Sequence, residues 1–252
     1  MSQDLQALAR RLEGAQATQN ERFNQASGGK SLPVGTGFAH FRGEGHPLNQ
    51  ALGLVDPISA SELEAIEAFL GTPTVLELSP AADPGLWLLL AKRGYCLQQF
   101  QLLWTRSLLL PVSERSSAKV QIVAPSEAAS FNRIVGAGYL DLDEWEDLVP
   151  PFEVPIGIPN AWSFLVYAEG CPAGGGTLGI VEGVALLSGA AVLPRYRGRG
   201  LQKALITTRL QFARQLGCDL ACASTAPGTA SQRSYEASGF GVAYPKVEMS
   251  RS

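Results

Sequence analysis

A short basic turn carries the clearest chemistry in the sequence. The stretch Val192-Leu193-Pro194-Arg195-Tyr196-Arg197-Gly198-Arg199-Gly200-Leu201 places three arginines and two glycines between an apolar run and an amphipathic one. A helix that begins near Gly200 would offer unpaired backbone N–H groups and the positive end of its dipole. Glycines let that backbone approach a ligand, and the arginines add positive charge. The pattern predicts a pyrophosphate-binding site at the start of a helix.

Other phosphate-binding motifs fit this turn less well. A Walker loop would require a Gly-Lys-Ser/Thr run, and none follows at the right spacing. A dinucleotide fingerprint would require a third glycine at the position of Lys203. An Arg-Gly tract that binds nucleic acid is disfavoured because the run is short and lies between an expected strand and an expected helix. A basic turn with a purely structural glycine cap stays open as the alternative.

A second motif follows downstream, in Tyr235-Glu236-Ala237-Ser238-Gly239-Phe240. The two motifs, Arg195-x-x-Gly198-x-Gly200 and Tyr-x-x-x-Gly-Phe, occur in this order around an expected helix and strand. Together they resemble the acyl-CoA signature of the GNAT (N-acetyltransferase) superfamily. The resemblance covers about residues 119–249.

This resemblance implies a central sheet that splays open after the strand ending at Val192, with the pantetheine arm of acyl-CoA paired to the backbone there. It implies an acyl-CoA site formed by Ala191, Val192, Leu193, Arg195, Arg197, Gly198, Arg199, Gly200 and Leu201. It also implies that Tyr235 is the general acid for the departing CoA thiolate, a task that suits a phenol protonated at neutral pH. An ordinary packed tyrosine is the alternative.

One position departs from the family pattern. The family often has an asparagine about seven residues before the tyrosine, where this chain has Gly228. Ser231, Gln232 and Ser234 are candidates for the missing polar contact near the thiol, and Ser231 is assigned to the predicted acyl-CoA site.

The acceptor side has no single outstanding residue. Acidic residues cluster after a helix expected from residue 126, at Asp141, Asp143, Glu144, Glu146 and Asp147. They would form either an acidic lip that attracts a cationic amine or a solvated helix face, and the second interpretation is favoured. Glu182 lies in an apolar run, where a turn between two strands is favoured over a base with a raised pKa.

Composition limits the class of protein. The chain has 252 residues, 46% hydrophobic and 17% charged, with a net charge of −3, which gives no general attraction to nucleic acid or anionic membranes. The N-terminus does not read as a secretory signal, and the most apolar stretch is too short to span a bilayer. The four cysteines form no disulfide or zinc pattern. A soluble, cytoplasmic protein without a metal is expected.

Periodicity and turn signals place the remaining elements. Helices are expected at residues 5–23, 59–70, 86–93, 126–137 and 201–216, and residues 228–238 are expected to be a turn leading to a helix. Strands are expected at residues 34–42, 50–55, 74–78, 99–110, 119–123, 161–168, 176–181, 184–192 and 220–225. Ser59 to Glu62 is a capping-box pattern, and Asp83-Pro84 is a helix start.

The helix–strand–helix unit that ends at Gly94-Tyr95 recurs in the unit that ends at Gly239-Phe240. This recurrence indicates an internal repeat whose halves join near residues 111–118, and chance similarity of two common units stays open as the alternative.

The fold class predicted is therefore α/β with a mixed α+β sheet, GNAT-like, in two tandem domains. Residues 1–112 would be a degenerate GNAT-like domain and residues 113–252 the catalytic one. The expected activity is transfer of an acetyl group from acetyl-CoA to a primary amine of a small molecule or peptide by direct attack. A non-catalytic CoA-binding or sensing module is the alternative, with a structural scaffold third. No nucleic acid or membrane partner is expected, and a homodimer stays open.

Overall fold

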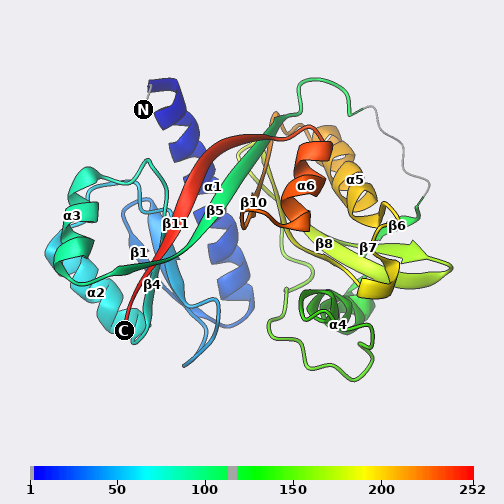
Figure 1. Cartoon of the computed structure of the whole chain (residues 1–252), viewed down its shortest axis with the longest axis horizontal. Helices are drawn as coiled ribbons and strands as arrows, with labels where there is room; N and C mark the ends of the chain where they lie inside the picture. The colour runs from blue at the N-terminus through cyan, green and yellow to red at the C-terminus, as the bar shows by residue number, and fades with distance from the viewer. Residues whose placement is uncertain (1–2, 113–117) are drawn as a thin grey trace. The chain divides into compact units, whose positions relative to one another are not determined.

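The structure is a computed structural model that describes residues 3–112 and 118–252 (Figure 1). The chain divides into two units. Unit 1 comprises Met1–Trp104, Ser224–Thr229 and Val242–Ser252, and unit 2 comprises Thr105–Ala223 and Ala230–Gly241. Residues 113–117 of the predicted linker lie outside the described residues.

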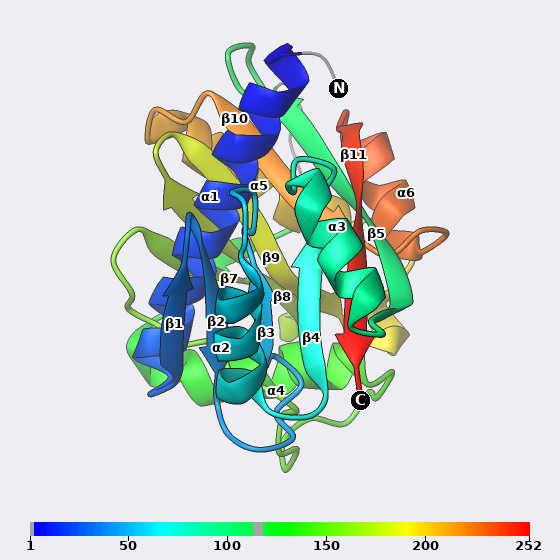
Figure 2. The ribbon, with the colours of Figure 1, turned by 90° about the vertical axis from the view of Figure 1, so that its left-hand side faces the viewer.

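Unit 1 begins with a long helix and builds its sheet from short strands. Its elements are α1 (Gln3–Ala26), β1 (Lys30–Val34), β2 (Gly37–Phe41), β3 (Gln50–Leu52), α2 (Ala60–Leu70), β4 (Thr74–Leu78), α3 (Pro84–Lys92), most of β5 (Cys96–Ser107) and most of β11 (Gly241–Arg251). Its strands follow the order β1-β2-β3-β4-β11-β5. Helices α2 and α3 lie on the face of these strands opposite α1 (Figure 2).

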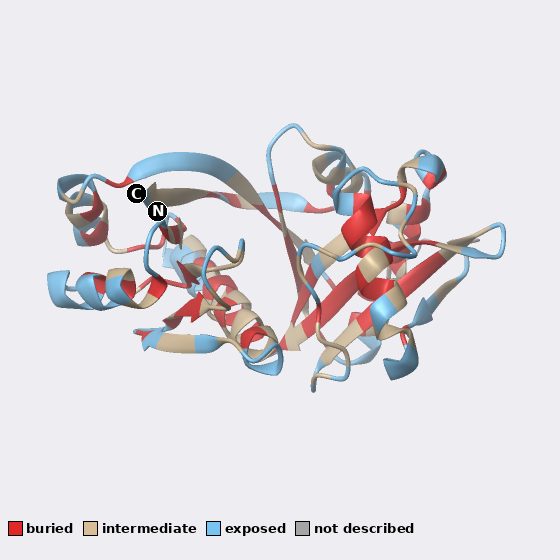
Figure 3. Ribbon diagram, turned by 90° about the horizontal axis from the view of Figure 1, so that it is seen from below, coloured by how far each residue is buried: buried red, intermediate tan, exposed pale blue. Residues whose placement is uncertain are grey.

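Unit 2 contains the turn and the tyrosine singled out above. Its elements are β6 (Val120–Ile122), the 3-10 turn η1 (Pro125–Glu127), α4 (Ala128–Tyr139), β7 (Ala161–Ala168), β8 (Cys171–Val181), β9 (Val184–Val192), η2 (Pro194–Tyr196), α5 (Leu201–Gln215), the first part of β10 (Leu220–Thr225) and α6 (Ala230–Ala237). Its strands follow the order β10-β9-β8-β7-β6. Burial is concentrated in the strands and on the inner helix faces (Figure 3).

Glycines in β8 let helices approach both faces of the unit 2 sheet. A Cβ on Gly175 would lie 2.7 Å from Phe131 of α4, and one on Gly176 would lie 2.9 Å from Arg209 of α5. Because neighbouring residues of a strand point to opposite faces, α4 packs on one face and α5 on the other.

Local signals for the helix starts are confirmed. Ser59 and Glu62 form the capping box of α2, and Asp83 caps α3 with Pro84 in its first turn. The repeated order is also present, as α2-β4-α3-β5 and as α5-β10-α6-β11.

The last strand was not predicted. β11 contains Pro245 and three charged residues, Lys246, Glu248 and Arg251, which weaken a strand pattern. It pairs antiparallel with β4, from Val247 opposite Leu78 to Arg251 opposite Thr74. The chain therefore passes from unit 1 to unit 2 within β5 and returns within β11.

Two further predictions need correction. The extended segment at residues 34–42 is the second half of a hairpin, in which β1 and β2 pair with Val34 opposite Gly37. The acidic residues after α4 lie in an irregular loop and not on a helix face, because α4 ends at Tyr139 and Asp141 has a positive φ of 57°. No helix in the described ranges is long and apolar enough to cross a membrane.

Candidate active site

The sheet of unit 2 opens between β9 and β10. These two strands pair in parallel only from Val184 opposite Leu220 to Leu186 opposite Cys222. The strands therefore part after Leu186, within β9, so the gap that the GNAT resemblance implies beside this strand includes Ala191 and Val192. Beyond Leu186, β9 keeps its other neighbour, β8, with Gly174 opposite Val192.

A bulge in β9 lies just beyond this parting. The register between β8 and β9 shifts between Gly175 and Thr177, and Gly189 has a positive φ of 54°. Such a bulge bends a strand and redirects its backbone groups. It accounts for β9 leaving β10 before its own end.

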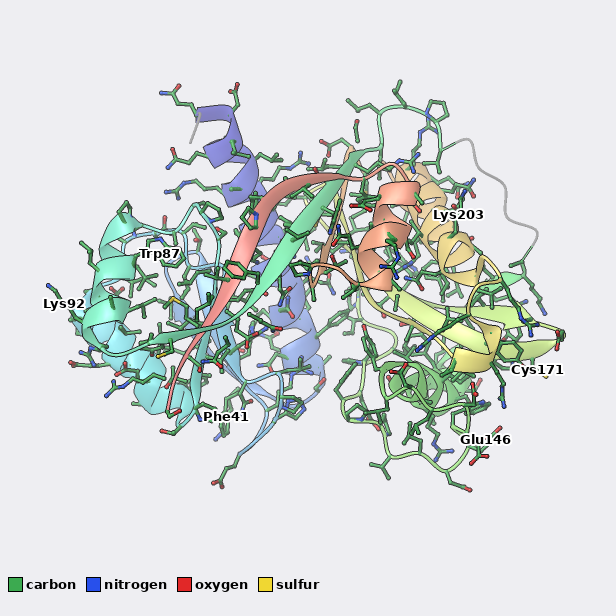
Figure 4. The ribbon with its side chains drawn as sticks, in the orientation of Figure 1. Phe41, Trp87, Lys92, Glu146, Cys171 and Lys203 are labelled. Atoms are coloured by element: carbon green, nitrogen blue, oxygen red, sulfur yellow. The ribbon has the colours of Figure 1, made fainter. Side chains whose placement is uncertain are left out.

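The predicted basic turn joins the end of β9 to α5. Leu193 and η2 lead to Gly198 and Gly200, which have positive φ angles of 76° and 74°. Gly200 is the N-cap of α5 and carries no side chain that could satisfy the first N–H groups of the helix. A Cβ on either glycine would meet no atom within 4 Å, so these glycines leave open space above the turn. The first turn of α5 also carries the exposed Lys203 (Figure 4).

The three arginines of the turn have different surroundings. The Arg197 guanidinium is held by Asp141 (2.5 Å) and by the carbonyl oxygens of Gly138 (2.7 Å) and Val192 (3.0 Å). It therefore braces the turn against the end of α4. Arg199 pairs with Glu169 at 2.6 Å.

Arg195 and Arg199 both lie over the ring of Tyr196, each 5.3 Å from its centroid. This stacking keeps two cations beside the start of α5. A phosphate role for Arg195, Arg197 and Arg199 stays a prediction.

The acidic loop after α4 is tied to the same turn. Asp141 bonds Arg197 as described, and the Asp143 carboxylate accepts a hydrogen bond from the backbone N–H of Arg195 (2.7 Å). The Glu146 carbonyl accepts from Arg133 (2.6 Å). Part of the acidic cluster thus positions the glycine turn.

Tyr235 lies on α6 and is 3% exposed. Its ring packs edge-on against Phe240 of the same motif, with centroids 5.0 Å apart. The phenol interacts with the Arg209 guanidinium from α5 and with the Tyr139 phenol from α4. Groups from three helices therefore meet around Tyr235.

Burial raises the pKa of Tyr235, and the nearby Arg209 cation opposes that rise. The phenol is consequently a proton donor at neutral pH. Burial of the phenol end of Tyr139 raises its pKa although the residue as a whole is 49% exposed, and the backbone N–H of Ala190 opposes the rise. Ala190 lies beside the bulge residue Gly189, so the Tyr139 phenol is linked to the parted edge of β9.

Arg209 and Tyr139 were missed in the sequence. Arg209 lies one helical turn after the buried Leu205 of α5, and no pattern distinguishes a buried arginine from an exposed one in a single sequence. Tyr139 ends α4 without a motif around it. Only the tertiary structure brings these residues to Tyr235.

Among the polar candidates on α6, Gln232 bonds Glu236 (2.9 Å), and the Ser234 hydroxyl donates to the Ala230 carbonyl (2.9 Å). Ser231 is half-buried, and its hydroxyl has no hydrogen bond among the described residues. It stays the predicted polar contact near the thiol.

Glu182 forms, with Gly183, the positive-φ turn between β8 and β9, which confirms the turn interpretation. The described residues contain no cluster of three or more His, Cys, Asp or Glu side chains suited to a metal.

Comparison with known proteins agrees with this geometry. Residues 130–240 match the model of the acetyltransferase (GNAT) family, a span that contains α4, the glycine turn and Tyr235. The resemblance to this family that was seen in the sequence is confirmed over this span. No curated protein matches the chain.

Solved structures share the fold. A GCN5-related N-acetyltransferase from Kribbella flavida superposes with a TM-score of 0.70 at 21% identity, covering 96% of this chain and 95% of that one. A GCN5-related N-acetyltransferase from Sphaerobacter thermophilus gives 0.52 at 16% identity, with 76% and 64% covered. A tandem GNAT protein from the clavulanic acid biosynthesis pathway gives 0.53 at 17% identity, with 76% and 67% covered. The GNAT-like mixed α/β fold is therefore confirmed.

Proposed function

We propose that this chain is an acetyl-CoA-dependent N-acetyltransferase that transfers the acetyl group to a primary amine by direct attack. The observation that carries the proposal is the layout of unit 2. A parted strand, β9, leads into a helix start that has no side-chain cap, and the buried Tyr235 interacts with Arg209, which donates to the Ser188 carbonyl of β9. A carrier with a diphosphate at one end and a thioester at the other matches this layout.

The residues fit acetyl-CoA as co-substrate. The backbone of Ala191, Val192 and Leu193 lies past the last pairing with β10, which leaves that edge for the pantetheine arm. The pyrophosphate would bind the N–H groups at the start of α5, where the glycines leave space and the helix dipole favours an anion.

The chemistry assigned to the chain is proton transfer. The amine nitrogen attacks the thioester carbonyl, the C–S bond breaks, and Tyr235 donates its proton to the departing sulfur. Its protonated state at neutral pH follows from burial. The attacking amine loses its own proton to a base or a water chain.

A thermal-shift titration with acetyl-CoA tests the binding site. Stabilisation should reach about 2.7 kcal/mol at a hundredfold excess over Kd. Gly198→Glu should lose the stabilisation because it places a carboxylate at the turn. Gly217→Glu is the matched control, since Gly217 has a similar φ of 83° and equally open surroundings at the other end of α5. If both variants shift like the wild type, the turn does not hold acetyl-CoA.

Turnover separates an enzyme from a CoA-binding module. Release of CoA thiol is followed with an amino acid, a polyamine, an aminoglycoside and an arylalkylamine as acceptors. Tyr235→Phe should keep the acetyl-CoA thermal shift and lose about a hundredfold or more in kcat. Binding without turnover, unaffected by Tyr235→Phe, would favour the sensing module.

The domain assignment is part of the same proposal. Residues 1–112 form a degenerate GNAT-like domain that supports the catalytic residues 113–252. The start of α2 supports degeneracy, because the capping box of Ser59 and Glu62 already satisfies two of the N–H groups there and places a carboxylate in the first turn. A cytoplasmic location and a homodimer stay predictions.

A further inference from the structure

Arg209 is a buried cation in unit 2 that the reaction described above does not use. Its side chain is fully buried on α5. Burying a guanidinium is costly unless its donors are satisfied. Nε donates to the Leu205 carbonyl (3.0 Å), and Nη1 donates to the carbonyls of Thr177 (2.9 Å) and Ser188 (3.3 Å). Nη2 is buried without a well-formed hydrogen bond among the described residues.

The two carbonyls bound by Nη1 belong to the bulge. Thr177 and Ser188 are opposite each other in the β8–β9 register, at the edge of the shift that ends with Gly189. Gly176 makes room for the guanidinium, because a Cβ there would lie 2.9 Å from Nη1. Arg209 therefore fixes the backbone where β9 leaves β10.

The same guanidinium interacts with the Tyr235 phenol. Arginine can only donate hydrogen bonds, and Nη2 is its donor without a partner, so the phenol oxygen faces this cation as an acceptor. The phenol proton then points away from Arg209. The other titratable groups that face Tyr235 are Tyr139 of α4 and the buried Cys222 of β10, and both are neutral in their ordinary state at pH 7.

We propose that Arg209 is a positioning residue for Tyr235, which directs the phenol proton into the gap between β9 and β10 and holds the phenolate after the proton has left. The inference rests on the proposed function. The proton of the Tyr235 hydroxyl passes to the CoA sulfur as the C–S bond breaks. The resulting phenolate is paired with the guanidinium until it regains a proton released by the attacking amine.

A double-mutant cycle tests this coupling. Arg209→Met should lower kcat by about tenfold to a hundredfold, less than the full contribution of a general acid, with KM for acetyl-CoA changed little. In a Tyr235→Phe background, Arg209→Met should have no further effect on kcat, because its partner is gone. Arg214→Met, an exposed arginine of the same helix, is the control and should leave kcat unchanged.

A second measurement reads the phenol directly and needs no acceptor. In protein labelled with 3-fluorotyrosine, Tyr235→Phe identifies the ¹⁹F signal of position 235. Its titration should move to higher pH in Arg209→Met, because the phenolate loses its cation, and should stay near the wild type in Arg209→Lys. Arg209→Gln serves as the neutral variant if Arg209→Met does not fold.

The outcomes separate the two proposals. The inference is overturned if the effects of Arg209→Met and Tyr235→Phe on kcat are additive. It is also overturned if the ¹⁹F titration in Arg209→Met or Arg209→Gln equals that of the wild type. In either case Arg209 only supports the bulge. If no amine is acetylated although the ¹⁹F titration shifts as expected, the pairing of Arg209 with Tyr235 stands and the proposed enzymatic function fails.

Discussion

Helices α2 of unit 1 and α5 of unit 2 occupy the same place in the repeated order, yet their first turns are built in opposite ways. In α2, the Ser59 backbone N–H donates to the Glu62 carboxylate (2.8 Å), and the Glu62 backbone N–H donates to the Ser59 hydroxyl oxygen (3.2 Å). In α5, the N-cap is Gly200 with a left-handed backbone. The third helical position is a carboxylate in α2 and Lys203 in α5. The first arrangement stabilises the helix internally, and the second leaves its positive end for an external anion.

Buried charge shows the same contrast. In unit 1, Lys246 of β11 is fully buried with Glu13 (3.0 Å), Glu77 (2.5 Å) and Gln16 (3.0 Å). These carboxylates raise the pKa of Lys246 despite its burial. In unit 2, Arg209 keeps Nη2 without a well-formed bond. The fully paired ammonium of Lys246 stabilises one packing, whereas the one donor of Arg209 without a partner is available for chemistry.

The largest effect should come from separating the two halves. The fragment of residues 113–252 loses β4, to which β11 pairs, and β5, which neighbours β10 in the sheet. We expect no cooperative unfolding transition by circular dichroism. Co-expression with residues 1–112 should restore it. If the fragment alone folds and acetylates like the whole chain, the supporting role of the N-terminal half is wrong.

Lys246→Met should destabilise the chain by about 3–5 kcal/mol, because it leaves buried carboxylates without their cation. Urea denaturation measures the change. Lys92→Met, at an exposed lysine of α3 (Figure 4), is the control. Equal effects of the two substitutions would mean that the buried cluster contributes nothing specific to unit 1.

A single substitution can give the start of α5 the charge that the start of α2 carries. Lys203→Glu places in α5 the carboxylate that α2 has at its third position. The acetyl-CoA-induced thermal shift should shrink by an amount equivalent to about 1 kcal/mol or more, while the unliganded Tm should not fall. The acetyl-CoA-induced thermal shift of Lys203→Gln should lie between those of the wild type and Lys203→Glu. If the acetyl-CoA-induced thermal shift of Lys203→Glu equals that of the wild type, the anion does not bind near the first turn of α5.

The sequence predicted most of this architecture where the signals are local. The capping box at Ser59, the strand at Thr74–Leu78 and the glycine turn before α5 depend on neighbours within a few residues. β11 was not predicted because its stability comes from β4 and from the partners of Lys246, which are distant in sequence. The parting of β9 after Leu186 and the meeting of Arg209 with Tyr235 likewise depend on long-range packing. A fold can therefore be predicted from local patterns more fully than a site can.

The smallest effect is a pH dependence in the α2 cap. Hydrogen bonds from the Ser59 hydroxyl and backbone lower the pKa of Glu62 below its ordinary value of 4.5. A carboxylate with a lowered pKa stabilises the folded state above its ordinary pKa, and this contribution is lost as the pH falls through the lowered value. The urea midpoint of the wild type should therefore exceed that of Glu62→Gln at neutral pH and converge with it in acid. Glu44→Gln, at an exposed glutamate outside the cap, should show no such convergence. A constant difference between wild type and Glu62→Gln at all pH values would mean that the charge of Glu62 does not contribute, and that α2 and α5 differ at their starts in shape alone.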